Sequence, residues 1–406
     1  MKLNFLKLSL NGIYISLFAS ISAASVFIYR GNPGDIGIIS DAGQKILMGV
    51  NPYVESEFAN SPVTAVAIHL VASIVPSMIF LFAIQLLNII GIVVFVKFVL
   101  SYFEVPDKSG VILFIVTLTI SYRSLIANIQ LTGILLALFV LSEKLTTKPR
   151  SLQKFLGYLI ILLAFELKPQ IVLPLLLLVF LRNRDYLLKL CAALCILACH
   201  IVLNIYYGAV LEVLWIEKIS GFSDKSFLEG PEISIWKAVA HFSVAPTFTK
   251  LISTMALILF YLLLVFLIFR NRRNALIVGL AAPFIGSYAH MYDLLGLFIV
   301  FLALNLKNIS LNIPMILLLA IPYDTQIVPL IICSMLVMLF VQLTSEDKPF
   351  LLAIGYLSWT ITSIILLLTI NFIDSNDQEL SISLRLILVI LVSGFAVIRR
   401  QSPSLI

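Results

Sequence analysis

Long apolar runs are the feature that most constrains what this chain can fold into. Three of them cover residues 89–100, 173–181 and 251–269. A helix on the surface of a soluble protein keeps one polar face toward water, and these runs have none. Hydrophobic residues make up 61% of the chain, against roughly 45–50% in soluble domains. The runs and this excess exclude a disordered chain and a single soluble core, and they predict an all-α, polytopic membrane protein.

The lysines and arginines predict how the chain crosses the membrane. They cluster between the apolar runs, at residues 2–7, 144–154, 182–189, 270–273 and 399–400. Loops rich in Lys and Arg stay on the cytoplasmic side, so we assign all five clusters to that side. The net charge of +6 does not indicate binding to nucleic acid, because the basic residues lie in short clusters between the apolar runs.

This assignment gives fourteen predicted spans and places both termini in the cytoplasm. The spans are residues 11–29, 76–100, 110–122, 125–142, 155–167, 170–181, 187–207, 250–269, 274–287, 292–306, 311–322, 326–342, 350–371 and 382–398. Several are too short to cross a ~30 Å hydrocarbon core alone. They form pairs interrupted by polar residues at 166–169, 290–293 and 323–324, each facing outside. Twelve crossings with re-entrant pieces fit the sequence nearly as well.

The organisation is that of a single membrane domain, residues 1–406. A core over residues 11–306 carries two long outer loops, 31–75 and 208–249, and residues 307–406 supply C-terminal transmembrane helices. The apolar run near the N-terminus continues through residues 26–29, past its small residues, so it predicts a retained first helix rather than a signal peptide. Because the inner loops are brief, we expect any active site on the outer face.

Two aspartates in the first outer loop invite different interpretations. Asp41 with Gln44 resembles a capping box, and Gly49 is a natural C′ residue, so we expect a short helix over 42–48 with Asp41 as its N-cap. Asp35 has no such structural task. It follows a Pro-Gly turn and precedes an apolar segment, where a partly desolvated carboxylate suits a general base. The alternative for Asp35 is a solvated turn aspartate.

Polar residues at two span ends form the next candidates. Arg123, Asn128 and Gln130 lie at the outer end of two spans; they can bind sugar hydroxyls, or they can join helices within the bundle. Lys168 lies at apparent membrane depth, where a charge usually marks a functional pathway or a buried pair. It can neutralise a lipid-linked phosphate, pair with Glu166, or extend toward the headgroups.

A third polar interruption separates the apolar runs near residue 290. His290 and Asp293 are three residues apart and therefore share one face of a helix, and Tyr292 lies between them. These side chains can contact phosphate or sugar. The alternative is a core histidine with its hydrogen bonds satisfied inside the protein.

In this order, these elements resemble the GT-C glycosyltransferases, in particular family 87 and the related transferases that use polyprenyl-phosphate-mannose. The family pattern in the first outer loop is matched by Asp35, Ala42, Gly49 and Tyr53. The Tyr-x-Pro element that follows appears as residues 60–62, Asn-Ser-Pro, without its aromatic residue.

The later elements of the family pattern are matched in part. Its Asn-Gly-Gln element appears as Asn128-Ile129-Gln130, with isoleucine at the glycine position. Its Lys-Pro element is intact at residues 168–169, and its late Tyr-Asp element appears at residues 292–293. The resemblance covers roughly residues 11–306, and each motif is short.

The resemblance implies a GT-C-like fold and an inverting hexosyltransferase in the cell envelope. The enzyme would take a sugar, most simply a mannose-like hexose, from a polyprenyl-phosphate donor and pass it to a glycan or glycolipid. It would lie in a bacterial inner membrane and act on the outer face. By matching, Asp35 is the general base and Lys168 holds the donor phosphate, with Arg123 and His290 as helpers. Asn128, Gln130, Tyr292 and Asp293 complete the expected substrate-binding set.

The sequence indicates no metal or other cofactor, since its cysteines lie in apolar stretches and only His200 is near them. The rival class is a multi-pass transporter or a flippase for lipid-linked glycans, which also has broken helices and buried charges. A transporter predicts two related halves with polar groups near the midplane. The chain shows no repeat of one half in the other, and its polar interruptions gather on one predicted face.

Overall fold

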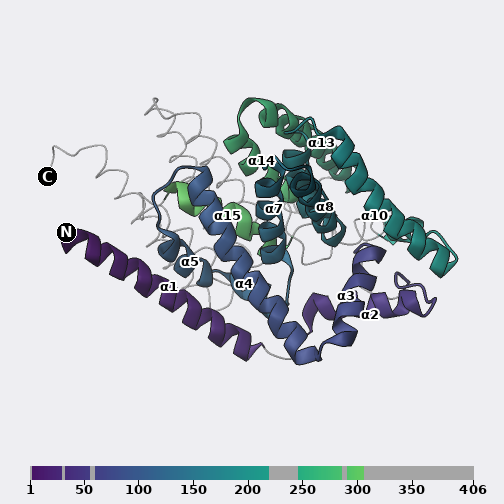
Figure 1. The fold of residues 1–406 in the computed structure, drawn as a ribbon, viewed down its shortest axis with the longest axis horizontal. Coiled ribbons are helices and arrows are strands. Elements are labelled where there is room, and N and C mark those ends of the chain that lie inside the picture. The colour runs from purple at the N-terminus through teal and green to yellow at the C-terminus, as the bar shows by residue number, and fades with distance from the viewer. Residues whose placement is uncertain (1, 30–32, 55–59, 219–245, 286–289, 306–406) are drawn as a thin grey trace.

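In the computed structural model, residues 2–29, 33–54, 60–218, 246–285 and 290–305 are described, and this part of the chain contains helices and no strand. Figure 1 shows the helices crossing and packing as a bundle. Apolar runs form helices here because a helix satisfies every backbone hydrogen bond within its own segment. The all-α class predicted from the sequence is confirmed for these residues.

The helices follow the chain in order. They are α1 (Lys2–Ile28), α2 (Gly34–Leu47), α3 (Pro62–Ile74), α4 (Ser77–Tyr102), α5 (Ser109–Thr117), α6 (Ile120–Ala127), α7 (Thr132–Thr146), α8 (Ser151–Leu167), α9 (Pro169–Phe180), α10 (Tyr186–Tyr207), α13 (Pro246–Arg270), α14 (Arg272–Ile285), the 3₁₀ helix η1 (Met291–Leu294) and α15 (Leu295–Asn305). A further helical segment covers residues 211–218.

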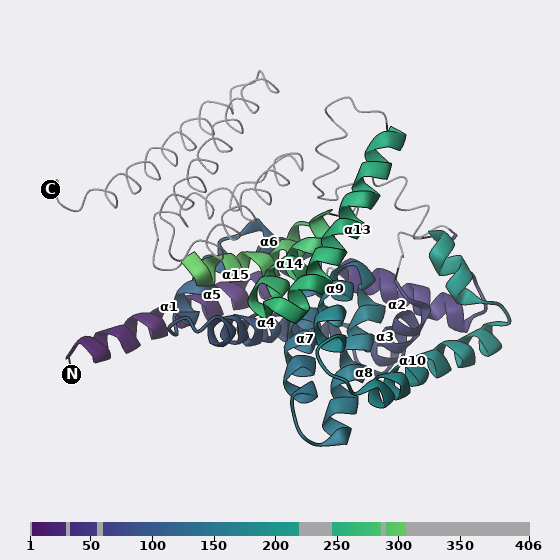
Figure 2. The ribbon, with the colours of Figure 1, turned by 90° about the horizontal axis from the view of Figure 1, so that it is seen from above.

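Three of these helices are long and apolar enough to cross a membrane: Asn11–Ile28 within α1, α4 and α10. The pair α5 and α6, bent by 69°, makes a fourth if it counts as one span. Figures 1 and 2 place α1 and α10 at opposite edges of the molecule. The lengths and compositions of these helices indicate a membrane protein.

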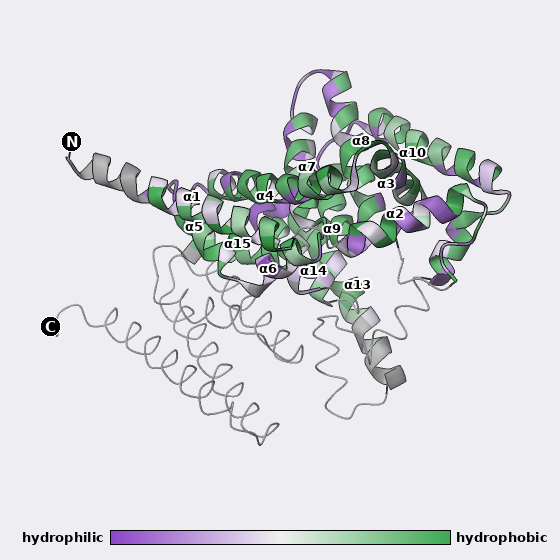
Figure 3. Ribbon diagram, turned by 90° about the horizontal axis from the view of Figure 1, so that it is seen from below, coloured by the Kyte–Doolittle hydropathy of each residue, from purple (hydrophilic) through white to green (hydrophobic). Residues whose placement is uncertain are grey.

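The surface of α10 supports the same conclusion. Large apolar side chains are exposed along its length, and Figure 3 draws most of this helix in the hydrophobic colour. Cys191, Cys195 and Cys199 also lie on its exposed side. A continuous apolar surface of this size is unusual on a soluble monomer and fits contact with lipid.

The first outer loop contains two packed helices, α2 and α3, rather than the single short helix expected over 42–48. That expectation was wrong because the apolar residues after Asp35 follow helical spacing. Ile36, Ile39, Gly43 and Ile46 are all buried on one side of α2, so the helix begins at Gly34. Asp41 is therefore an exposed residue within the helix and not its N-cap.

The end of α2 agrees with the prediction for Gly49. This residue has a φ of 73°, and the Val50 amide donates to the Lys45 carbonyl at 2.8 Å while the Gly49 amide donates to Ile46 at 3.0 Å. These two bonds define a Schellman motif, in which glycine takes the left-handed position at no steric cost.

Other span boundaries agree with the sequence to different degrees. The predicted spans 76–100, 155–167, 170–181 and 187–207 correspond to α4, α8, α9 and α10. The predicted boundary between spans 110–122 and 125–142 was wrong, since the chain breaks at 118–119 and again at 128–131. The predicted spans after residue 306 and the interruption at 323–324 lie outside the described residues.

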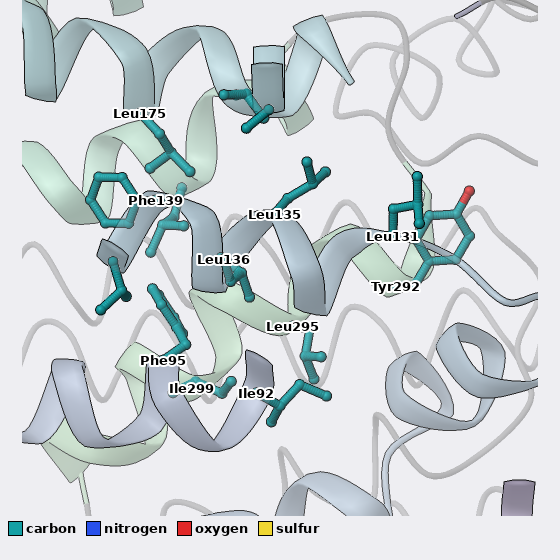
Figure 4. Close-up of a cluster of buried hydrophobic side chains, with 14 of the residues drawn as sticks. Ile92, Phe95, Leu131, Leu135, Leu136, Phe139, Leu175, Tyr292, Leu295 and Ile299 are labelled. Carbon is teal, nitrogen blue, oxygen red and sulfur yellow. The ribbon is translucent and has the colours of Figure 1, made fainter. Parts of the chain in front are cut away.

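The core lies between α4, α7, α9 and α15. Figure 4 shows Ile92 and Phe95 from α4 facing Leu136 and Phe139 from α7, with Ile299 of α15 beside them. These side chains are almost fully buried. The core extends along α7 to Leu131, where it meets Tyr292, so the apolar packing fixes the position of the polar residues at that end.

The predicted cytoplasmic clusters meet at the other end of the bundle. The Arg182 Nη1 lies 2.5 Å from Glu143 Oε1, and Arg272 approaches the same oxygen at 3.4 Å. Lys154 pairs with Asp185 at 3.0 Å. Three of the basic clusters assigned to the cytoplasm, 144–154, 182–189 and 270–273, are thus brought together by ion pairs at one end.

Candidate functional site

The break between α8 and α9 creates the centre of the candidate site. Helix α8 ends at Leu167 and α9 begins at Pro169, because proline has no amide to continue the helix but suits its first position. Lys168 stands between them with a φ of −148° and a ψ of 84°. The predicted interruption of this span is confirmed, and it places Lys168 inside the protein with only 8% of the residue exposed.

The Lys168 ammonium has three described neighbours. Its Nζ lies 3.1 Å from Gln130 Oε1 and 3.5 Å from Asp293 Oδ1, and it stands 4.3 Å above the centre of the Tyr292 ring. At 3.5 Å the Asp293 contact is mainly electrostatic rather than a strong hydrogen bond. An ammonium has three donors, so two oxygens of the described residues do not exhaust its capacity to bind an anion.

Asp293 is the fixed partner in this group. Its Oδ1 accepts from the Thr132 hydroxyl at 2.9 Å, and its Oδ2 accepts from the His290 amide at 3.0 Å. The second bond closes the first turn of η1, where Asp293 also donates its own amide to the His290 carbonyl at 2.9 Å. With both oxygens held and its side chain buried, Asp293 keeps one orientation toward Lys168. No motif in the sequence indicated a role for Thr132.

His290 borders this group through Tyr292. Their rings are stacked with centroids 5.0 Å apart. Burial lowers the pKa of His290, and the nearby charges of Asp293 and Asp35 oppose this effect while that of Lys168 adds to it. The imidazole is therefore neutral at neutral pH, so it can offer a hydrogen bond to a substrate but not a positive charge.

Asp35 approaches the same region from the first outer loop. It lies half-buried in the first turn of α2, where a carboxylate interacts favourably with the helix dipole. Its amide donates to the Asn128 carbonyl at 3.1 Å, two residues before Gln130. The structure thus brings Asp35 and Lys168 to the same end of the bundle, on either side of residues 128–130.

Two predicted site residues are not drawn into this group. Arg123 is exposed on α6, and its guanidinium forms no hydrogen bond or ion pair with the side chains that the structure describes. The Asn128 side chain is exposed and bonds to Ser124 at 3.2 Å, so its link to the site runs through the main chain.

The suggested pair between Glu166 and Lys168 does not form. Glu166 accepts instead from Ser61 and lies 3.0 Å from His200 Nε2. The other ring nitrogen of His200 lies 2.5 Å from Glu212 Oε1, and Asn204 donates to Glu212 Oε2 at 2.6 Å. We call these five residues the Glu166–His200–Glu212 cluster. A pair between Glu166 and Lys168 was one of the alternatives from the sequence, but the two side chains contact different residues on either side of the helix break.

Next to this cluster, two further hydrogen bonds tie the first outer loop to the helix break. Tyr53 donates its hydroxyl to the Asn60 carbonyl at 3.1 Å, and the Asn60 amide group donates to the Leu167 carbonyl at 2.9 Å. Desolvation by burial, with the nearby charges of Glu212 and Glu166, raises the pKa of Tyr53 far above its usual range. The family-matched Tyr53 is thus a neutral structural hydroxyl next to the cluster. This cluster was not predicted, although a histidine within an apolar run, such as His200, could have indicated a buried polar contact.

Within the residues that the structure describes, no group of three or more His, Cys, Asp and Glu side chains is arranged to hold a metal ion. No protein-family model matches the chain, and no curated protein matches it. The arrangement of Lys168, Gln130, Tyr292, Asp293 and Asp35 therefore has to carry the functional argument.

Proposed function

We propose that the chain is a polytopic membrane glycosyltransferase of the GT-C type. It would transfer a hexose, most simply a mannose-like sugar, from a polyprenyl-phosphate donor to a glycan or glycolipid on the outer face of a bacterial inner membrane. The observation that carries this proposal is the buried Lys168 ammonium at a helix break, which is linked to Asp35 through residues 128–130.

In this reaction the acceptor hydroxyl oxygen attacks the anomeric carbon of the donor sugar. Asp35 takes the hydroxyl proton as the new C–O bond forms, and the bond between the anomeric carbon and the phosphate oxygen breaks on the opposite face. The electron pair leaves with the polyprenyl phosphate, so the product has the inverted configuration.

The chemistry asks little of the protein beyond placement and charge stabilisation. The phosphate is a stable anion, and no strong acid is needed to expel it. Lys168 is suited to stabilise the charge that grows on the phosphate, because a buried cation acts more strongly than one in water. Gln130 and Asp293 would hold the ammonium in place, and His290 and Tyr292 would offer a neutral hydrogen bond and an aromatic surface to the sugar.

The test is consumption of a lipid-linked sugar by the purified protein in detergent. Polyprenyl-phosphate-hexoses with radiolabelled sugars are offered with a glycolipid acceptor, and the product is separated from the donor. We expect transfer of the sugar with release of polyprenyl phosphate. Binding of these donors without release of polyprenyl phosphate, or their movement across proteoliposomes without chemical change, would favour a flippase instead.

A further inference from the structure

One strained turn joins the two halves of the candidate site. Helix α6 ends at Ala127, and its end has the hydrogen bonds of a Schellman motif. The Gln130 amide donates to the Leu125 carbonyl at 3.0 Å, and the Ile129 amide donates to Ile126 at 3.4 Å. Ile129, which lies between Asn128 and Gln130, has a φ of 45° and is the C′ residue of the motif.

Isoleucine is an unfavourable residue for this position. A left-handed backbone brings Cβ against the neighbouring carbonyl, and a β-branched residue there is a true outlier. Glycine would avoid the clash, as Gly49 does at the end of α2. The Ile129 side chain is completely buried, which anchors the turn and offsets the strain. Strain held in this way is often found where a site needs a fixed geometry.

The two residues that flank Ile129 touch the two candidate functional groups. On one side, the Asn128 carbonyl accepts from the Asp35 amide at 3.1 Å. On the other side, Gln130 Oε1 accepts from Lys168 Nζ at 3.1 Å. The amide of Asp35 is in the first turn of α2, where it has no partner within its own helix.

Gly34 makes this contact possible. It has a φ of 49°, and a Cβ placed on it would lie 2.0 Å from the Asn128 carbonyl oxygen. This atom belongs to the backbone and cannot rotate away. Any side chain at position 34 would therefore push the start of α2 away from residues 128–130.

We infer that the strained main chain of residues 128–130, in contact with Gly34, sets the distance between Asp35 and Lys168. Gly34 and Ile129 are then positioning residues, and they act through the backbone rather than by touching substrate. This inference rests on the proposed function for its effect on turnover, but the contact itself is tested without any activity.

The first experiment compares Gly34→Ala with Gly12→Ala. Gly12 lies in α1, and a Cβ added there meets no atom within 4 Å. Amide hydrogen exchange is followed by mass spectrometry in peptides that contain residue 35, and turnover and donor affinity are measured on the same samples. We expect faster exchange at residue 35 in Gly34→Ala and a turnover about 100-fold lower at nearly unchanged donor affinity, since small displacements of a reacting group cost this much. Wild-type exchange and turnover are expected for Gly12→Ala.

A second pair of variants keeps the test decisive if Gly34→Ala does not fold. Ile129→Gly and Ile129→Ala both remove the buried side chain beyond Cβ, but only glycine adopts the left-handed backbone without strain. Exchange at residue 35 should therefore be roughly 5- to 30-fold slower in Ile129→Gly than in Ile129→Ala.

Equal exchange in the Ile129 pair, or wild-type exchange and turnover in a folded Gly34→Ala protein, would overturn the inference. If instead exchange responds as expected while the wild-type protein transfers no sugar, the backbone contact stands and the proposed function fails.

Discussion

Asp293, the buried partner of Lys168, is held by contacts that do not depend on the lysine. The Asp293 carboxylate is fully buried and is also bonded to Thr132 and to the His290 amide, so it remains in place when the lysine is changed. A donor phosphate would add a second anion to the same ammonium. A role of Lys168 in binding the donor phosphate can therefore be separated from its role in balancing the charge of Asp293.

We predict that Lys168→Gln destabilises the protein and weakens donor binding. Removing one member of a buried ion pair typically costs about 3–5 kcal/mol. In the double variant Lys168→Gln/Asp293→Asn no buried charge is left unpaired, so thermal stability should largely recover. Donor affinity should stay roughly 10- to 100-fold lower, the loss expected for one charge-assisted hydrogen bond.

The measurements are thermal unfolding in detergent and binding of a radiolabelled donor, each on both variants. Recovery of donor affinity together with stability in the double variant would mean that Lys168 serves only to balance Asp293.

At the scale of elements, the Glu166–His200–Glu212 cluster joins α8, α10, the start of α3 and the helical segment 211–218. Both ring nitrogens of His200 face carboxylates, so both carboxylates lose their shared partner when the imidazole is removed. Because Glu166 lies two residues before Lys168, the cluster also fixes the helix break that carries the candidate cation.

We predict that His200→Leu lowers the stability of the protein by about 3–5 kcal/mol, because buried Glu166 and half-buried Glu212 lose the imidazole that lies between them and keep only Ser61 and Asn204 as partners. Cys195→Ala, on the exposed side of the same helix, should leave stability within about 0.5 kcal/mol. Thermal unfolding in detergent compares the two. Adding Glu166→Gln and Glu212→Gln to His200→Leu should recover much of the loss, and an equal melting temperature for His200→Leu and Cys195→Ala would contradict the role of the cluster.

Local chemistry explains why some elements were predictable from the sequence. The break at Lys168 follows from Pro169, and the end of α2 follows from Gly49. The partners of Glu166 could not be read in this way, since Ser61 is 105 residues away and His200 is 34 residues away. Such contacts depend on how helices cross, which a single sequence does not specify.

The start of α2 was missed for a different reason. The residues Asp41 and Gln44 form an acceptable capping signal, and a stronger signal, the buried stripe of α2 from Ile36 to Ile46, lay in the same segment. The left-handed conformation of Ile129 was not predicted, because an isoleucine in the sequence gives no indication of a positive φ. The sequence did not reveal that the Asn128 side chain would be exposed.

At the scale of the whole molecule, the candidate site and the basic clusters lie at opposite ends of the same short helices. Helix α8 runs from Ser151, near the basic end, to Leu167 at the site, and its 17 residues span roughly 26 Å. Helix α7 runs the other way, from Thr132 at the site to Thr146. This separation is close to the thickness of a bilayer core, and it supports a site on the face opposite the basic loops.

We therefore predict that a reporter fused after Arg273 reads cytoplasmic and that one inserted at Lys225 reads external. The first follows the basic cluster at 270–273, and the second lies in the predicted outer loop 208–249, which the charge rule places outside. Alkaline phosphatase and green fluorescent protein fusions, which are active on opposite sides of a bacterial inner membrane, report the two positions. The same side for both would contradict a site on one face.

Asp35→Asn compared with Asp41→Asn tests the central claim most directly. The two aspartates are six residues apart on α2, but Asp35 stands in the first turn beside Asn128 and Asp41 is exposed within the helix. Each change keeps the size of the side chain and removes its charge, and asparagine and aspartate have similar helix propensities. The measurement is turnover of a polyprenyl-phosphate-sugar donor, with donor binding and thermal stability as controls. The account predicts a loss of about 10²–10⁴-fold for Asp35→Asn with donor binding retained, and near-normal turnover for Asp41→Asn. Near-normal turnover for Asp35→Asn, or equal losses at both positions, would contradict it.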